Sequence, residues 1–152
     1  MVDDAPGDVW QPTTPAMLQM VAGLAAPRLR TAFAAAGLDG IRPAQAVALV
    51  PLATGPLHAS ILAEYLGVTR QAVAQAIRAL EPSGYVTRSQ SPDDARTLLI
   101  ELTARGRQAL KVMRANAIAI EADWRIVLGE QRLTDLRETL QLLLTHSGDK
   151  LA

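Results

Sequence analysis

Residues 57–86 have the sequence LHASILAEYLGVTRQAVAQAIRALEPSGYV, and this stretch decides the fold. Its apolar residues recur at helical spacing in two runs. The first run predicts a helix over about residues 57–66, with its inward positions at Leu57, Ile61, Leu62 and Leu66. Gly67 then provides a helix stop, and Thr69 is a favourable N-cap for a second helix that ends near Pro82. The inward positions of this second helix are Val73, Ala76, Ile77 and Leu80.

Two β-prone segments follow directly, GYVTRSQ at 84–90 and TLLIEL at 97–102, and the polar SPDDAR separates them. This pattern predicts a β-hairpin. Helix, three-residue turn, helix and hairpin, in this order, are the elements of a winged helix-turn-helix. The predicted fold class is therefore mainly α-helical with a small β-hairpin wing, flanked by N-terminal and C-terminal helices.

The outward face of the second helix carries hydrogen-bonding and small side chains, with no acid before Glu81. Its members are Thr69, Arg70, Gln71, Ala74, Gln75 and Arg78. Arginine can pair with guanine edges and glutamine with adenine edges, while threonine and helix-terminal amides can hold phosphates. An ordinary solvated surface is the alternative, but such surfaces usually mix Glu with Lys at helical spacings. The face therefore favours contact with double-stranded DNA.

The hairpin turn places Arg96 at its tip, where the side chain can bury nothing against the protein. A hairpin beside a recognition helix reaches the DNA backbone or the adjacent minor groove, whose narrow segments attract an inserted arginine. Arg96 is therefore the predicted DNA contact of the wing, and Asp94 is predicted to structure the turn by accepting hydrogen bonds. Arg88 on the incoming strand and His58 at the start of the first helix are further candidates for contact with phosphate.

The chain divides into four predicted segments. Residues 1–15 are acidic and rich in proline, which predicts a flexible arm. Residues 16–40 predict an N-terminal dimerisation helix with a kink or break near Gly23–Pro27. Residues 41–102 form the predicted DNA-binding domain, which opens with a short helix near Pro43. Residues 103–148 form the predicted C-terminal dimerisation helices.

The long helix predicted from Thr103 to about Leu128 carries apolar residues at alternating steps of three and four. This period is typical of helices that pack against a partner helix. Packing against the chain's own first and last helices is the alternative, and we expect a mixture of both. The predicted dimer-interface residues are Leu18, Val21, Leu110, Met113, Ile120, Leu136, Leu140 and Leu143.

The wing carries a recognisable signature. Asp94-Ala95-Arg96, followed after five residues by Leu102-Thr103 and then Gly106, resembles the D-x-R…LT-x-x-G signature of the MarR family of transcription regulators. Residues 62–88 are similar to that family's helix-turn-helix, and residues 121–144 to its C-terminal dimerisation helices. The resemblance implies a homodimer that binds a pseudo-palindromic operator as a repressor. It also implies release of the DNA when a small aromatic or phenolic effector binds.

Composition narrows the remaining possibilities. A chain of 152 residues with 49% apolar residues and no net charge predicts a folded domain whose DNA contacts come from a local basic face. The absence of cysteine excludes disulfides and thiolate chemistry. No apolar run approaches the roughly 20 residues of a membrane span, and the N-terminus lacks a secretion signal, so we expect a cytoplasmic protein without membrane contact.

Enzymatic chemistry is not expected from the sequence. His58 and His146 lie far apart in the pattern, so neither a metal site nor a cofactor is expected. No glycine-rich phosphate loop or catalytic motif is present. The alternative hypothesis keeps the same fold as a protein–protein interaction module without DNA binding. Salt-sensitive binding to duplex DNA distinguishes the two.

Overall fold

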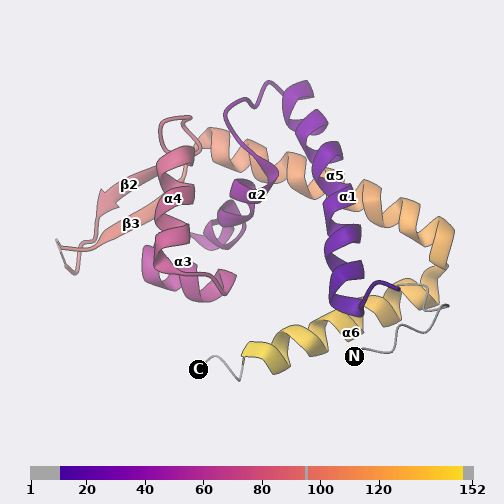
Figure 1. The fold of residues 1–152 in the computed structure, drawn as a ribbon. Helices are drawn as coiled ribbons and strands as arrows, with labels where there is room; N and C mark the ends of the chain where they lie inside the picture. The colour runs from indigo at the N-terminus through magenta and orange to yellow at the C-terminus, as the bar shows by residue number, and fades with distance from the viewer. Residues whose placement is uncertain (1–10, 95, 149–152) are drawn as a thin grey trace, which may run out of the picture.

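The computed structural model describes residues 11–94 and 96–148, and it is mainly helical with one small β-sheet (Figure 1). The predicted fold class is confirmed. Most of the predicted N-terminal arm lies outside the described residues, and its end belongs to the first helix. In chain order the elements are α1 (Thr14–Ala35), α2 (Pro43–Ala46), the 3-10 turns η1 (Val47–Leu49) and η2 (Pro51–Thr54), β1 (Leu57–His58), α3 (Ala59–Leu66), α4 (Arg70–Leu80), β2 (Val86–Gln90), β3 (Leu98–Leu102), α5 (Ala104–Leu128) and α6 (Glu130–Gly148).

The helix-turn-helix consists of α3 and α4, and its helix stop and cap are those that the sequence predicts. Ile61, predicted to face inward, is instead 43% exposed. Gly67 follows α3 with a φ of 63°, a left-handed conformation that glycine adopts without steric cost. Thr69 caps α4, because its Oγ1 accepts a hydrogen bond from the Ala72 amide at 3.1 Å. The inward residues Val73 and Ile77 are buried in the core. The opposite face of α4 is therefore left on the outside.

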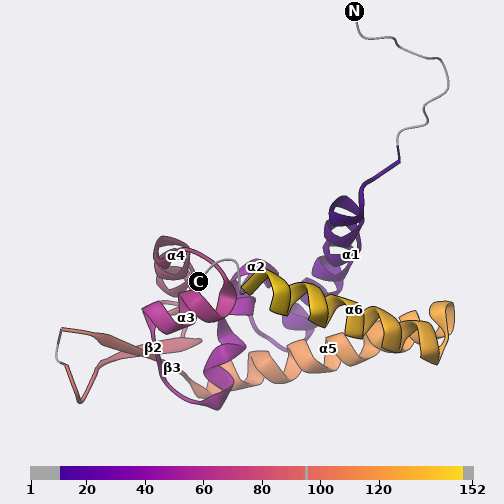
Figure 2. The same ribbon diagram turned by 90° about the horizontal axis from the view of Figure 1, so that it is seen from below.

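The sheet has three antiparallel strands in the order β1-β3-β2, one strand more than the predicted hairpin. β2 and β3 pair from Val86–Leu102 to Gln90–Leu98 and form the wing, which projects from one end of the molecule (Figures 1 and 2). β1 adds Leu57 opposite Ile100 and His58 opposite Leu99. The prediction that Leu57 begins a helix is wrong, because this strand is too short to show a period and is defined by its pairing with a distant segment.

The joint between the wing and the long helix is closely packed. Thr103 stands alone between β3 and α5, and its Oγ1 accepts a hydrogen bond from the Gly106 amide at 3.0 Å. The same hydroxyl lies 2.6 Å from the Gly84 carbonyl oxygen, to which it donates. Gly106 is buried, and a Cβ at this position would lie 2.1 Å from the Tyr85 carbonyl oxygen. The backbones approach so closely here that glycine alone fits.

The first helix is continuous, although Pro27 lies inside it. The sequence predicts a kink or break near Gly23–Pro27, and the continuous helix shows that the chain is not broken there. Contacts on both sides of the proline hold the helix: Val21 and Arg28 share a small hollow with Trp124 of α5, and Phe33 is buried in the core. These tertiary contacts override the local effect of proline, which removes one backbone donor.

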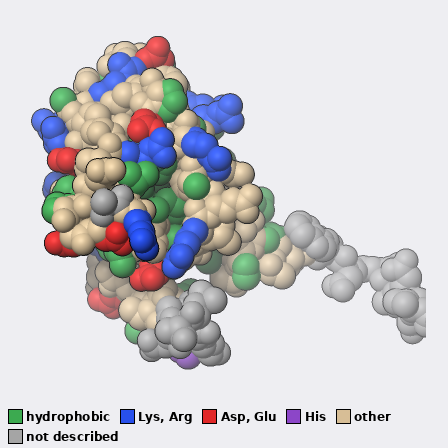
Figure 3. All heavy atoms as spheres, turned by 90° about the vertical axis from the view of Figure 1, so that its left-hand side faces the viewer, with side chains coloured by type: hydrophobic (Ala, Val, Ile, Leu, Met, Phe, Trp, Pro, Cys, Tyr) green, Lys and Arg blue, Asp and Glu red, His purple; other side chains and the backbone are tan. Residues whose placement is uncertain are grey.

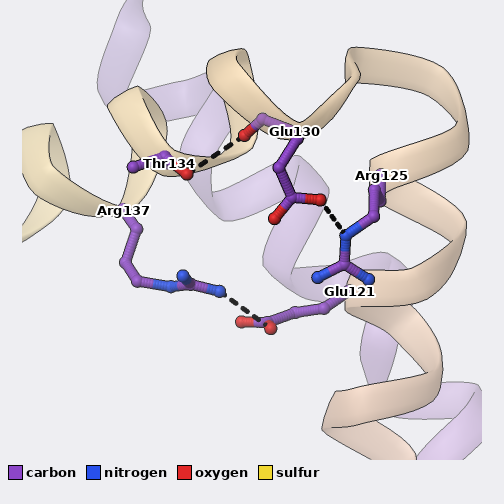
Figure 4. A network of polar contacts seen from close by, with 5 residues as sticks. All are labelled: Glu121, Arg125, Glu130, Thr134 and Arg137. Carbon is purple, nitrogen blue, oxygen red and sulfur yellow. Dashed lines mark hydrogen bonds and ion pairs between the residues drawn. The ribbon is translucent and has the colours of Figure 1, made fainter.

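Polar contacts span the bend between α5 and α6 (Figure 4). Arg125 donates from Nε to Glu130 Oε2 at 2.6 Å, and Arg137 donates to Glu121 Oε2 at 2.9 Å. All four side chains are well exposed, so these ion pairs add little to stability. They lie across the bend by which α6 turns back from the far end of α5.

The hydrophobic core lies under the winged part, where α3, α4, the sheet and the start of α5 meet. The short helix predicted at Pro43 is the single turn α2, which continues into η1 and η2. Large apolar side chains on α1, on the far end of α5 and on α6 remain exposed in the single chain, among them Leu24 at 74%, Val127 at 80% and Leu144 at 73%. Across the described ranges, none of the helices combines the length and apolar character needed to cross a membrane.

Candidate nucleic-acid interface

The outward face of α4 carries the predicted DNA-reading side chains. Arg78 donates from Nε to the Ala74 carbonyl oxygen at 3.2 Å, which lays its side chain back along the helix. The first acid, Glu81, follows the last residue of α4. A basic and amide surface therefore extends along the helix up to its C-terminal end. All six predicted residues of this face lie at the surface: Thr69, Arg70, Gln71, Ala74, Gln75 and Arg78.

The turn of the wing is held by Asp94. Its Oδ1 accepts a hydrogen bond from the Arg96 amide at 2.9 Å, and its carbonyl oxygen accepts from the Thr97 amide and hydroxyl, both at 3.0 Å. Arg96 is exposed, and its guanidinium makes no ion pair with any residue that the structure describes. Ala95, between the two, lies outside the described residues. The turn thus presents an arginine whose charge is available to a ligand.

Arg88 differs from the other candidates because it already has a partner. Its guanidinium lies 2.6 Å from Glu81 Oε2, so the ion pair joins the C-terminal end of α4 to β2. The hydrogen bond with Glu81, and then the charge of that carboxylate, raise the pKa of Arg88 above its ordinary value. The sequence predicts Arg88 as a phosphate contact, and the structure places it in this pair. Contact with a phosphate would have to compete with Glu81.

Two hollows flank the start and middle of α4. The first has a volume of about 520 Å³ and brings together four predicted residues from three elements, His58, Arg70, Asp94 and Arg96. The second, of about 250 Å³, lies between α4 and the sheet, with Arg78 and Arg88 among its lining residues. Figure 3 looks onto the wing side of the molecule, where basic side chains are spread with acidic and apolar groups among them.

One cluster beside this surface was missed by sequence reasoning. The Tyr85 hydroxyl donates to the Asp39 carbonyl oxygen at 2.6 Å. Arg105 lies over the Tyr85 ring, 5.0 Å from its centroid, and donates to the carboxylate and the carbonyl oxygen of Asp39. These contacts tie the loop after α1 to the base of the wing and the start of α5. No local pattern could reveal them, because the three residues lie far apart in the sequence.

The predicted dimer-interface residues divide into two groups within one protomer. Leu18, Val21 and Leu143 are exposed. Leu110 and Met113 pack on the core, Leu136 and Leu140 are half-buried, and Ile120 is buried at 9% exposure, beside α1. Packing within the chain therefore accounts for part of the α5 seam, as the alternative interpretation of its period expects.

An α4 face of arginine, glutamine and threonine, beside a two-stranded wing that presents an arginine, defines a winged helix-turn-helix protein. Among the described residues, no group of three or more histidine, aspartate or glutamate side chains is placed to hold a metal ion.

Comparison with known proteins narrows the class of winged helix-turn-helix protein to one family. Residues 42–98 match the model of the MarR family. HTH-type transcriptional repressors of Mycobacterium bovis and Mycobacterium tuberculosis are each 38% identical over 89 residues, which is 58% of this chain and 63% of each relative. The match thus spans less than two thirds of the length of these curated relatives.

Solved structures agree with this placement. The crystal structure of a probable transcriptional regulator from Pseudomonas aeruginosa is 30% identical in sequence, with a TM-score of 0.64, and covers 83% of this chain and 96% of that one. A SlyA-like transcription regulator from Listeria monocytogenes, at 16% identity, has a TM-score of 0.78 and covers 93% and 92% of the two chains, which shows the fold alone. The chain belongs to the MarR family of winged-helix transcription regulators, as its wing signature predicts.

Proposed function

We propose that this chain is a sequence-specific regulator of transcription that binds double-stranded DNA as a homodimer and represses a nearby gene. The observation that carries the proposal is the pairing of two surfaces. The acid-free face of α4 and Arg96, whose guanidinium has no ion pair among the described residues, both adjoin the first hollow, to which Arg70 and Arg96 contribute. α4 in the major groove would bring the wing to the adjacent minor groove.

In this proposal residues 41–102 form the DNA-binding domain, and α1, α5 and α6 form the dimerisation region. The apolar side chains of the second region support a dimer, because exposed apolar surface of this extent marks a protein–protein contact. Met20, Leu24, Ile126 and Leu142 are each more than half exposed in the single chain. A two-fold dimer implies a pseudo-palindromic operator with half-sites about 10–10.5 base pairs apart, or a multiple of this spacing.

The two further parts of the proposal, repression and its relief by an effector, are supported by different observations. The mycobacterial relatives are named transcriptional repressors, which favours that direction of control. A small aromatic or phenolic effector is supported by a hollow of about 470 Å³ between η2 and α5. Val50, Leu110 and Met113 supply apolar walls, while Lys111 and Arg114 supply two cations for an acidic group. Thermal-shift screening of aromatic acids, followed by DNA-binding assays, tests this part.

Selection of bound duplexes from a random pool tests the main proposal. We expect a symmetric site and binding that weakens steeply with salt. Arg96→Ala should make the slope of log affinity against log salt shallower by about 0.9 for each phosphate that the variant no longer neutralises, counted over both subunits. Folding should change by no more than about 0.5 kcal/mol, because the side chain is exposed. An Arg96→Ala protein with wild-type affinity across the salt titration contradicts the role given to the wing.

A further inference from the structure

A polar cluster outside the candidate interface joins three residues that lie far apart in the sequence, Asp39, Tyr85 and Arg105. The Tyr85 hydroxyl donates to the Asp39 carbonyl oxygen at 2.6 Å. Arg105 donates from Nη2 to the same carbonyl oxygen at 3.3 Å, and also to the Asp39 carboxylate. The guanidinium lies over the Tyr85 ring, 5.0 Å from its centroid. These contacts together are called the latch below.

The ion pair of the latch contributes little to stability. The Asp39 side chain is 92% exposed and that of Arg105 is 37% exposed, so solvent screens their attraction. Arg105 Nε is buried without a hydrogen-bond partner among the described residues, which costs free energy. Leu38 and Ile41, which flank Asp39, are already buried in the core. The latch adds direction to this packing, because hydrogen bonds are directional and apolar packing is not.

The latch joins two parts of the chain that have different proposed roles. Asp39 lies in the loop that follows α1, a helix of the proposed dimerisation region. Tyr85 is fully buried in the winged part. Its amide donates to the Leu80 carbonyl oxygen of α4 at 3.0 Å, and its carbonyl oxygen accepts from the Thr103 amide at 3.2 Å. The Tyr85 hydroxyl is therefore a fixed point of the winged part, to which the end of α1 is anchored.

The winged part has two connections to the proposed dimerisation region. The first is the stiff joint between β3 and α5 at Thr103. A unit that is held by one helix can still roll when that helix bends slightly, as long helices do. The second connection is the loop of residues 36–42 between α1 and α2. An anchor on this loop opposes such a roll, because it ties a second segment of the chain to the winged part.

We propose that the latch positions the two α4 helices of the dimer and so sets the half-site spacing that the protein accepts, an inference that rests on the proposed function. α4 has 11 residues, so its N-terminal end lies about 16 Å from the end near Tyr85. A rotation of the winged part by about 6° in each subunit can move the two N-terminal ends by about 3.4 Å in total, the rise of one base pair. The three residues of the latch are thus positioning residues, which act through α4 and not on the DNA.

The experiment compares duplexes that differ only in half-site spacing. The duplex selected by the wild-type chain is measured beside duplexes with one base pair inserted or deleted at its centre, by fluorescence anisotropy at constant ionic strength. The readout is the ratio of the affinities for the selected and the altered spacing. Loss of folded protein or of a DNA contact lowers all affinities together, whereas loss of positioning lowers this ratio.

Two substitutions open the latch without disturbing the core. Tyr85→Phe removes the hydroxyl and keeps the buried ring, while Asp39→Ala removes an exposed carboxylate. Of the hydrogen bonds in the latch, the double variant retains only the one from Arg105 to the Asp39 carbonyl oxygen. Tyr65→Phe is the matched control, because Tyr65 is the second tyrosine of the chain and is 71% exposed on α3. Urea unfolding checks that each variant is folded.

Wild-type protein and Tyr65→Phe should prefer the selected spacing by at least about tenfold, because an altered spacing puts the base contacts of one half-site out of register. A neutral hydrogen bond is worth about fivefold in an equilibrium constant. The double variant should therefore lower the ratio by at least about twofold, and a smaller change overturns the proposal. If Tyr85→Phe does not fold, Asp39→Ala alone is held to the same threshold.

Outcomes for the wild-type chain separate this inference from the proposed function. A wild-type chain that binds its selected duplex equally well at the altered spacings has no spacing for the latch to set. That result overturns the inference and leaves DNA binding in place. Failure of the wild-type chain to bind any duplex refutes both.

Discussion

Replacement of Gly106 by alanine tests the joint between the wing and α5. The added Cβ would lie 2.1 Å from the Tyr85 carbonyl oxygen and 2.9 Å from Leu102 Cδ2. The Tyr85 oxygen cannot retreat freely, because it accepts a hydrogen bond from the Thr103 amide at 3.2 Å. Either the start of α5 or the base of the wing has to move. We expect Gly106→Ala to lower the free energy of unfolding by about 3 kcal/mol or more.

The assay is urea unfolding followed by circular dichroism, at a fixed protein concentration because association in the proposed dimer would contribute to the measured stability. A loss of this size also lowers the midpoint of thermal unfolding by about 10 °C for a chain of this length. Gly23→Ala is the matched control, since a Cβ on Gly23 meets no atom of the described residues within 4 Å. Alanine inside a helix should stabilise by about 0.5–1 kcal/mol. A Gly106→Ala protein less than about 1 kcal/mol below wild type refutes the close approach.

Three further substitutions separate the roles proposed for other residues. Glu81→Gln should release Arg88, so that salt titration of duplex binding gives a slope steeper by about 0.9 per subunit; an unchanged slope identifies Arg88 as a support for the wing. Gln75→Ala should relax base preference at one symmetric position of the selected site and leave the salt slope alone, and an unaltered preference removes Gln75 from base reading. Leu140→Asp should sediment as a monomer or aggregate, because it places an unpaired charge in an apolar contact; a stable dimer of this variant contradicts the assigned interface.

Local chemistry explains which parts of the fold the sequence could predict. Gly67, Thr69 and Thr103 act within a few residues of their own positions, as a helix stop and two caps, and all three are confirmed. Their effect depends on backbone conformation and one short hydrogen bond, both of which the neighbouring sequence determines. The hairpin was predictable for the same reason, since its polar turn separates two β-prone segments.

Contacts between distant residues explain what the sequence could not predict. β1 exists because Leu57 pairs with Ile100, and α1 remains unbroken at Pro27 because α5 and the core hold both of its halves. In the candidate interface, the chemistry of α4 was evident from its spacing, but the pairing of Arg88 with Glu81 depends on how β2 lies against the end of α4. The hollow that joins His58 to Arg70 and Arg96 likewise depends on three separate elements meeting.

The stiffness of the joint at Thr103 gives α5 the properties of a lever. One residue, Thr103, separates β3 from α5. Its hydrogen bonds, together with the close contact at Gly106, leave no hinge between the wing and α5. The 25 residues of α5 span about 37 Å at 1.5 Å per residue. A tilt of about 5° at the far end, where the exposed apolar residues lie, therefore displaces the wing by about 3 Å, close to the 3.4 Å rise of one base pair. If these apolar residues form the proposed dimer contact, a tilt of this size there would shift the wing along the DNA by nearly one base pair.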